Sequence, residues 1–154
     1  MSNKKINILY VDDEVNNLIS FKATFRIKYT VHTAESGEQA IKLLKDNDIN
    51  VIITDQRMPG MTGVEFLETI LKDHPEPVRI LLTGYADMNA VVDAVNKGKI
   101  FHYLNKPWNE EELDMTIIKA YEVYNQRKTE KELNDKLTIS NEQLEFLLRQ
   151  KLLS

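Results

Sequence analysis

Five short apolar runs alternate with segments of helical spacing, and this alternation constrains the fold more than any other feature of the sequence. The runs lie at residues 6–11, 29–34, 51–54, 78–83 and 101–104. They are rich in Ile, Val, Leu and Tyr, and three of them are nearly continuous, as is typical of buried parallel strands. The unit of strand then helix repeats five times over roughly residues 5–125. This pattern predicts an α/β fold with a doubly wound, five-stranded parallel sheet and helices on both faces.

The composition changes beyond residue 125, where charged and polar residues dominate and Gly and Pro are absent. The sequence therefore predicts a globular domain at residues 1–125 and a helical extension or coiled-coil linker at residues 126–154. We expect one long C-terminal helix, from Glu110 to about Leu153. Ser140 and Gln143 have capping-box spacing, so a break and restart of the helix there is an alternative.

Four leucines in this extension follow heptad steps, with Ser140 between them on the same seam: Leu133, Leu137, Leu144 and Leu147. A monomer would leave such a stripe exposed to water. The pattern predicts that the terminal helix pairs in a parallel, two-fold homodimer.

Polar side chains stand where the predicted strands end. Asp12 and Asp13 follow the first strand, Asp55 ends the third, Thr83 ends the fourth, and Lys106 follows the fifth. In an open parallel sheet, ligands bind outside the carboxyl ends of the strands, so these five side chains are expected at one edge. Each has an ordinary alternative: the acidic pair could be a helix N-cap, Asp55 a turn residue and Lys106 a surface lysine.

The expected cluster suits metal-assisted phosphoryl transfer. Three neighbouring carboxylates repel one another unless a cation sits among them, and ligands that are all oxygen suit Mg²⁺, with Mn²⁺ as an alternative. An exposed carboxylate is a competent nucleophile toward phosphorus. A lysine and a hydroxyl would then stabilise charge on the transferring oxygens.

Four strings of residues, in this order, resemble the bacterial response-regulator receiver domain: YVDDE at Tyr10–Glu14, DQRMPGMTG at Asp55–Gly63, LTG at Leu82–Gly84 and YLNKP at Tyr103–Pro107. The resemblance covers residues 5 to about 125. It implies a flavodoxin-like fold with strand order 2-1-3-4-5, and a switch controlled by phosphorylation.

The resemblance also implies a role for each residue. Asp55 would accept the phosphoryl group, and Lys106 would pair with one of its oxygens. Asp13 would bind Mg²⁺ directly, and Asp12 would assist through water. The backbone carbonyl of Arg57 would complete the protein ligands.

Two further residues would move with the switch. Thr83 would bond the attached phosphoryl group and draw the following loop inward. Tyr103 would turn between exposed and buried positions, although a strand tyrosine packed in the core is the alternative. Lys106–Pro107 is expected to be a cis peptide.

The sequence departs from the commoner pattern in several places. Trp108 stands where Phe is usual, and the Lys-Pro-Trp string resembles a subgroup often joined to cyclic-dinucleotide phosphodiesterase or transcription-activator modules. Arg57 and Tyr85 would flank the path of attacking water, where large side chains are expected to change the lifetime of the aspartyl phosphate.

The implied partners are a sensor histidine kinase or phosphotransfer protein, and an output domain outside this chain if the sequence is a fragment. If the chain is complete, it would act by protein contact. A turnover phosphatase of the haloacid-dehalogenase type is a rival, but it would need D-x-D after the first strand, and Asp55-Gln56-Arg57 lacks the second aspartate. A binding module that has lost phosphorylation is a second rival, opposed by the intact acidic set.

Composition narrows the function further. A net charge of −4 gives no general attraction to nucleic acid. No apolar run approaches the roughly 20 residues that span a bilayer. The absence of cysteine excludes disulfides and thiol catalysis, and we expect a cytoplasmic protein.

Overall fold

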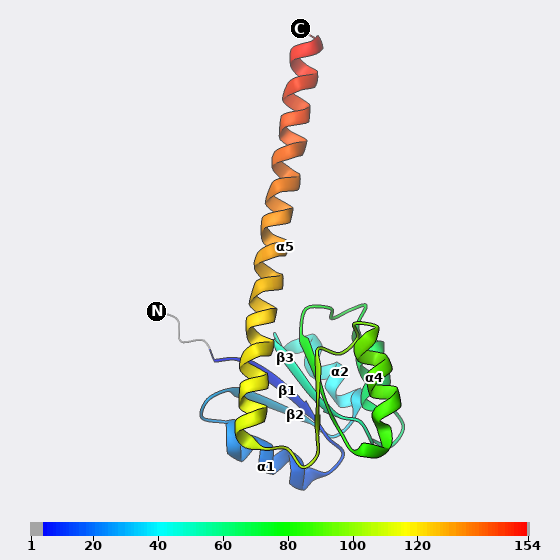
Figure 1. Cartoon of the computed structure of the whole chain (residues 1–154). Helices are drawn as coiled ribbons and strands as arrows, with labels where there is room; N and C mark the ends of the chain where they lie inside the picture. The colour runs from blue at the N-terminus through cyan, green and yellow to red at the C-terminus, as the bar shows by residue number, and fades with distance from the viewer. Residues whose placement is uncertain (1–4, 154) are drawn as a thin grey trace. The chain divides into compact units, whose positions relative to one another are not determined.

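Five parallel strands form one sheet in the order β2-β1-β3-β4-β5 in the computed structural model (Figure 1). The structure describes residues 5–153, apart from the side chain of Tyr85, so the expectation for Tyr85 lies outside the described part. The strands are β1 (Asn7–Val11), β2 (Thr30–Ala34), β3 (Val51–Asp55), β4 (Val78–Thr83) and β5 (His102–Asn105). The predicted fold and strand order are confirmed.

A helix follows each strand, as the alternation predicts. The helices are α1 (Val15–Phe25), α2 (Gly37–Asp46), α3 (Gly63–Ile70), α4 (Met88–Asn96) and α5 (Glu110–Leu153), with a 3-10 turn, η1 (Tyr85–Asp87), before α4. Because α5 continues through Ser140, the alternative of a break at that residue is wrong. None of the described helices has the length and apolar character needed to cross a membrane.

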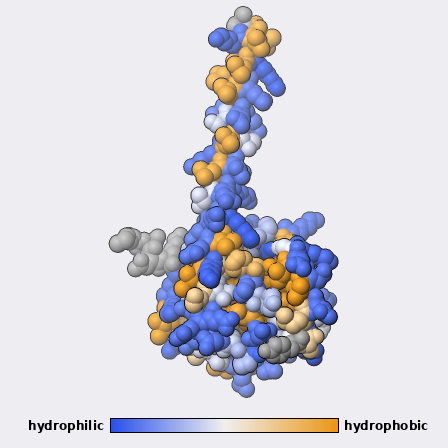
Figure 2. Space-filling view, in the orientation of Figure 1, coloured by the Kyte–Doolittle hydropathy of each residue, from blue (hydrophilic) through white to orange (hydrophobic). Residues whose placement is uncertain are grey.

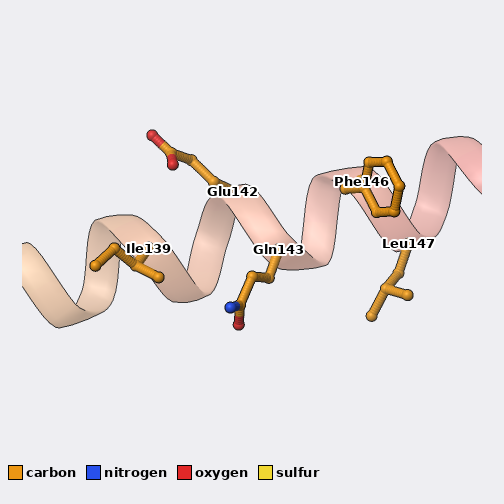
Figure 3. Close-up of a pocket in the computed structure, with 5 residues that line it drawn as sticks. All are labelled: Ile139, Glu142, Gln143, Phe146 and Leu147. Atoms are coloured by element: carbon orange, nitrogen blue, oxygen red, sulfur yellow. The ribbon is translucent and has the colours of Figure 1, made fainter.

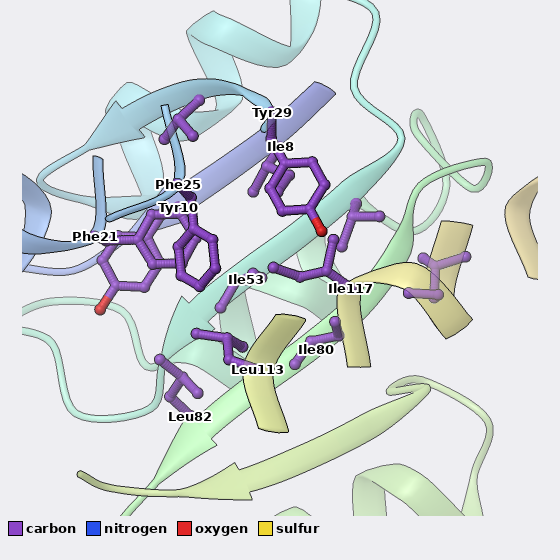
Figure 4. Close-up of a cluster of buried hydrophobic side chains, with 14 of the residues drawn as sticks. Ile8, Tyr10, Phe21, Phe25, Tyr29, Ile53, Ile80, Leu82, Leu113 and Ile117 are labelled. Atoms are coloured by element: carbon purple, nitrogen blue, oxygen red, sulfur yellow. The ribbon is translucent and has the colours of Figure 1, made fainter. Parts of the chain in front are cut away.

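Side chains on the two faces of the sheet form two separate hydrophobic clusters. Ile8, Tyr10 and Ile53 belong to the first, which packs against α1 and the beginning of α5 (Figure 4). Leu9 and Ile52 belong to the second, which packs against α2, α3 and α4. Neighbouring strand residues point to opposite faces, so a strand covered on both sides is apolar at almost every position. Each fully buried Leu, Ile or Phe side chain contributes about 1.5–3 kcal/mol to the free energy of unfolding. This burial holds the strands, and therefore their ends, in place.

The contacts within the chain divide it into two compact units, the first ending at Tyr124 and the second beginning at Asn125. The whole sheet and the first turns of α5 belong to the first unit. The second unit consists of the remainder of α5, whose large apolar side chains are exposed. All candidate site residues therefore belong to the first unit.

Candidate functional site

The strand register brings the acidic residues together. Val11 of β1 lies opposite Thr54 of β3, so the residues that follow them, Asp12 and Asp55, come side by side at the carboxyl edge of the sheet. Oxygen atoms of Asp12, Asp13 and Asp55 all lie within 4.8 Å of one another. Asp12 and Asp55 are buried, whereas Asp13 is exposed. This set of hard oxygen donors fits a cation such as Mg²⁺.

Lys106 supplies positive charge to the same cluster. The peptide N–H of Lys106 donates to the carbonyl of Thr83 at 2.9 Å, which fixes the chain just beyond β5. Its Nζ lies 2.8 Å from Asp55 Oδ1 and 4.0 Å from Asp12 Oδ2. The expected cis peptide between Lys106 and Pro107 is present. Lys106 is therefore an ion-pair partner of Asp55, and the alternative of an unpaired surface lysine is wrong.

Burial and charge act in opposite directions on Asp55. Burial raises the pKa of its carboxyl group, and the neighbouring charge of Asp12 adds to this. The hydrogen bond and positive charge of Lys106 lower the pKa but do not cancel the effect of burial. The site thus gathers negative charge at a net electrostatic cost, as expected where a cation binds.

Asp12 is held by three hydrogen bonds, none of which the sequence analysis predicted. The Tyr10 hydroxyl donates to Oδ2 at 3.0 Å, and Asn17 Nδ2 donates to the same oxygen at 3.1 Å. The peptide N–H of Glu14 donates to Oδ1 at 3.0 Å. Burial, followed by the charge of Asp12, raises the pKa of Tyr10 above its usual range, so the hydroxyl keeps its proton. The N-cap of α1 is Glu14, so the reading of the acidic pair as an N-cap is wrong.

The start of α3 fixes the loop that follows Asp55. Thr62 and Glu65 form a reciprocal capping box at the N-terminus of α3. The Gly63 N–H donates to the backbone carbonyl of Gln56 at 2.9 Å, and the Val64 N–H donates to the Gln56 side chain at the same distance. A side chain at Gly63 would overlap the backbone carbonyl of Asp55. The peptide of Asp55 is therefore packed directly against the start of α3.

The two residues expected to move lie on neighbouring strands. Thr83 is fully buried, and its hydroxyl donates to the carbonyl of Gly84 at 3.0 Å. Tyr103 is half-buried against the second hydrophobic cluster, and its ring stacks on His102. Thr83 thus ends β4, the strand beside β3, with its hydroxyl bonded to backbone.

Arg57 ties the loop after β3 to the loop after β4. Its Nε donates to Asp87 Oδ2 at 2.9 Å, although its side chain is 73% exposed. Asp87 is the N-cap residue of α4, and its side chain makes no capping bond there. Its carboxylate therefore pairs with Arg57 in place of capping the helix. Sequence reasoning gave no sign of this pair, whose members are 30 residues apart.

The fold and the acidic edge define a class of protein: a flavodoxin-like α/β domain with a candidate cation site at its strand ends. The chain belongs to the response regulator receiver domain family, because the model of that family matches residues 8–118.

Curated relatives include transcriptional regulators. The chain is 39% identical over 122 residues to the hydrogenase transcriptional regulatory protein HoxA of Cupriavidus necator, covering 79% of this chain and 25% of the relative. It is 31% identical over 134 residues to the regulatory protein AtoC of Escherichia coli, covering 86% and 29% respectively. The chain thus spans between a quarter and a third of the length of these two relatives.

Solved structures agree in fold over most of the chain. A structure described as adenylate cyclase from Rhodopirellula baltica has 34% identity and a TM-score of 0.83, covering 86% of this chain and 98% of that one. A response regulator receiver domain protein from Clostridium thermocellum has 33% identity and a TM-score of 0.73, covering 80% and 98%.

Proposed function

We propose that this chain is a phosphorylation-dependent switch that accepts a phosphoryl group on Asp55 from a sensor histidine kinase or phosphotransfer protein. The observation that carries the proposal is the 2.8 Å contact between Lys106 Nζ and Asp55 Oδ1 within a cluster of three carboxylates. The chain has no separate substrate in this scheme. It promotes its own phosphorylation and dephosphorylation and is not a turnover enzyme.

The reaction uses the residues at the edge of the sheet. A carboxylate oxygen of Asp55 attacks phosphorus as the bond from phosphorus to the donor's imidazole nitrogen breaks. The Lys106 ammonium, already beside Asp55, stabilises the negative charge of the phosphoryl oxygens. Asp13, Asp55 and the carbonyl of Arg57, assisted by Asp12, would hold Mg²⁺, with Mn²⁺ as the alternative, and the cation would supply further positive charge to the phosphoryl oxygens.

Phosphorylation then changes the surface around β4, α4 and β5. The phosphoryl group adds up to about two negative charges and new hydrogen-bond acceptors beside Thr83. The Thr83 hydroxyl leaves the carbonyl of Gly84 to donate to the phosphoryl group, and Tyr103 turns inward with the displaced loop. This surface change controls a downstream output.

Intact mass measurement tests the acceptor. With acetyl phosphate and Mg²⁺, the wild-type chain is expected to gain one phosphoryl group, and Asp55→Asn to gain none. A chelator of divalent cations is expected to prevent labelling of the wild type. Equal labelling of wild type and Asp55→Asn would remove Asp55 from its role, and sustained hydrolysis of small phosphate esters would favour the phosphatase.

We further propose that residues 126–154 pair two copies of the chain and link each copy to an output domain outside this chain. The four leucines of the heptad stripe are each more than half exposed: Leu133, Leu137, Leu144 and Leu147. Figure 2 shows hydrophobic surface along this second unit. A second copy of the helix would cover the stripe in a parallel two-fold coiled coil.

An open depression beside the stripe has the same interpretation. Its lining residues all come from one helix: Ile139, Glu142, Gln143, Phe146 and Leu147 (Figure 3). Ligand sites are concave and bury most of the ligand surface, which the side of a single helix does not provide. The depression therefore suits an apposed helix better than a small molecule.

Light scattering tests the dimer. The wild-type chain is expected to have twice the monomer mass, and Leu144→Asn to shift the equilibrium toward monomer because the variant places an amide in the seam. Glu145→Gln, the neighbouring position off the stripe, serves as the control and should keep the wild-type mass. A wild-type chain that stays monomeric at high concentration, phosphorylated or not, would remove the dimer from the proposal.

A further inference from the structure

Tyr10 brings a hydroxyl group from the hydrophobic core into the acidic site. Tyr10 is 1% exposed, and its ring belongs to the first hydrophobic cluster. A buried tyrosine hydroxyl needs a hydrogen-bond partner. Here the partner is Oδ2 of Asp12, a candidate cation ligand, at 3.0 Å.

The hydrogen bonds of Asp12 distinguish its two oxygen atoms. Oδ2 accepts from Tyr10 and Asn17 and also lies 4.0 Å from Lys106 Nζ, which is too far for a hydrogen bond. Among the described residues, the Glu14 N–H is the one hydrogen-bond donor to Oδ1. A carboxylate offers about four acceptor positions, two on each oxygen. Both positions on Oδ2 are therefore used, and the remaining one belongs to Oδ1.

The ring of Tyr10 is held so that the hydroxyl cannot easily turn aside. It stacks on Phe21, with ring centroids 4.2 Å apart and planes within 2° of parallel. Phe21 is fully buried, and its ring centroid lies 4.8 Å from that of Phe25 and 6.1 Å from that of Trp108. Figure 4 shows Tyr10, Phe21 and Phe25 gathered beside the sheet. Close packing of this kind fixes side-chain positions.

We propose that Tyr10 is a positioning residue for divalent cation binding: its hydroxyl holds Oδ2 of Asp12, so that Oδ1 is the oxygen presented to Mg²⁺ or to a water of its shell. The inference rests on the proposed function, because it concerns the same acidic site. Groups that orient a metal ligand from outside the coordination shell contribute strongly to affinity. Tyr10 acts through Asp12 and touches no reacting atom.

The test compares two tyrosine-to-phenylalanine variants of the full chain. Tyr10→Phe removes only the hydroxyl and keeps the ring on Phe21. Tyr29→Phe is the matched control, because the Tyr29 hydroxyl also donates to a carboxylate, that of Asp114, which does not belong to the acidic cluster. Calorimetric titration with MgCl₂ is expected to show about tenfold weaker binding for Tyr10→Phe and wild-type affinity for Tyr29→Phe.

Asn17→Ala provides a second route to the same answer. Asn17 is only half-buried, so its truncation should leave the fold intact even if Tyr10→Phe does not fold. It removes the other donor to Oδ2, and we expect weaker Mg²⁺ binding with unchanged unfolding. Mg²⁺ affinity within twofold of wild type for a folded Tyr10→Phe and for Asn17→Ala would overturn the inference.

The two proposals fail in different ways. Stoichiometric labelling of wild type on Asp55, together with unchanged Mg²⁺ affinity in both variants, would leave the switch standing and remove the positioning role. In the opposite case, the wild type binds Mg²⁺ more tightly than Tyr10→Phe but Asp55 is not labelled at all. That result would overturn the switch and keep the positioning role.

Discussion

Gly63→Ala should destabilise the fold and slow phosphorylation together, because Gly63 packs directly against Asp55, the proposed acceptor. A Cβ atom there would lie 2.7 Å from Leu81 Cδ1 and 3.1 Å from the carbonyl carbon of Asp55, and nearer still to the carbonyl oxygen. Cβ atoms in real proteins do not come within 3.0 Å of such atoms. Leu81 and the peptide of Asp55 must therefore move.

The size of the effect follows from opposing contributions. Overpacking a buried site costs about 1–3 kcal/mol. Replacing glycine by alanine returns about 0.4–1 kcal/mol by restricting the unfolded chain. We therefore expect a net loss of about 1.3 kcal/mol at the middle of these ranges, and up to about 2.6 kcal/mol, in the free energy of unfolding measured by urea denaturation. The rate of phosphoryl uptake from acetyl phosphate should fall about tenfold or more, because the nucleophile is displaced.

Gly84→Ala is the matched control. Gly84 also neighbours the site, but nothing lies within 4 Å of a Cβ built there, and its φ of −91° is ordinary for alanine. This variant should be as stable as the wild type or more stable by up to about 1 kcal/mol. If Gly63→Ala were as stable as Gly84→Ala and took up phosphoryl groups at the wild-type rate, the claim that α3 fixes the acceptor would be refuted.

Two charged contacts give further predictions. A double-mutant cycle with Arg57→Gln and Asp87→Asn should give a coupling of about 0.2–1 kcal/mol that shrinks at high salt, because the pair is partly exposed; additive single effects would contradict the pair. Burial raises the pKa of the Asp114 carboxyl group, but the hydrogen bonds from Tyr29 and Lys28 lower it by more. The pKa of Asp114 therefore lies below its usual value. Its stabilising contribution is present above the unfolded pKa and is lost as pH falls through the folded value. The stability advantage of wild type over Asp114→Asn should therefore be complete at about pH 6 and shrink below about pH 4; an advantage independent of pH would contradict this.

The sequence predicted the main chain of this fold well because buried parallel strands leave a strong signal. Each of the five apolar runs became a strand, with boundaries shifted by at most one residue. Parallel strands all end at the same edge, so the meeting of Asp12, Asp55 and Lys106 followed from their positions in the chain. The strand order came from the family resemblance, because periodicity alone does not say which strands are neighbours.

The side-chain contacts of the site were less accessible. The bond from Asn17 to Asp12 depends on α1 beginning at Val15, a boundary that the sequence does not fix. The pair of Arg57 and Asp87 depends on the conformations of two loops, which carry no periodic signal. The bond from Tyr10 had a weak sign, since residues two apart in a strand share a face, but Asp12 lies just beyond the end of β1.

The position of β1 inside the sheet has a consequence for the chain during its synthesis. β1 pairs with β2 and β3, while Lys106 lies beyond β5, the last strand to leave the ribosome. A nascent chain that ends before β5 lacks the ammonium that pairs with Asp55. Only a chain whose sheet is complete brings Lys106 to Asp55, so the ion pair at the strand ends cannot form before β5 has been synthesised.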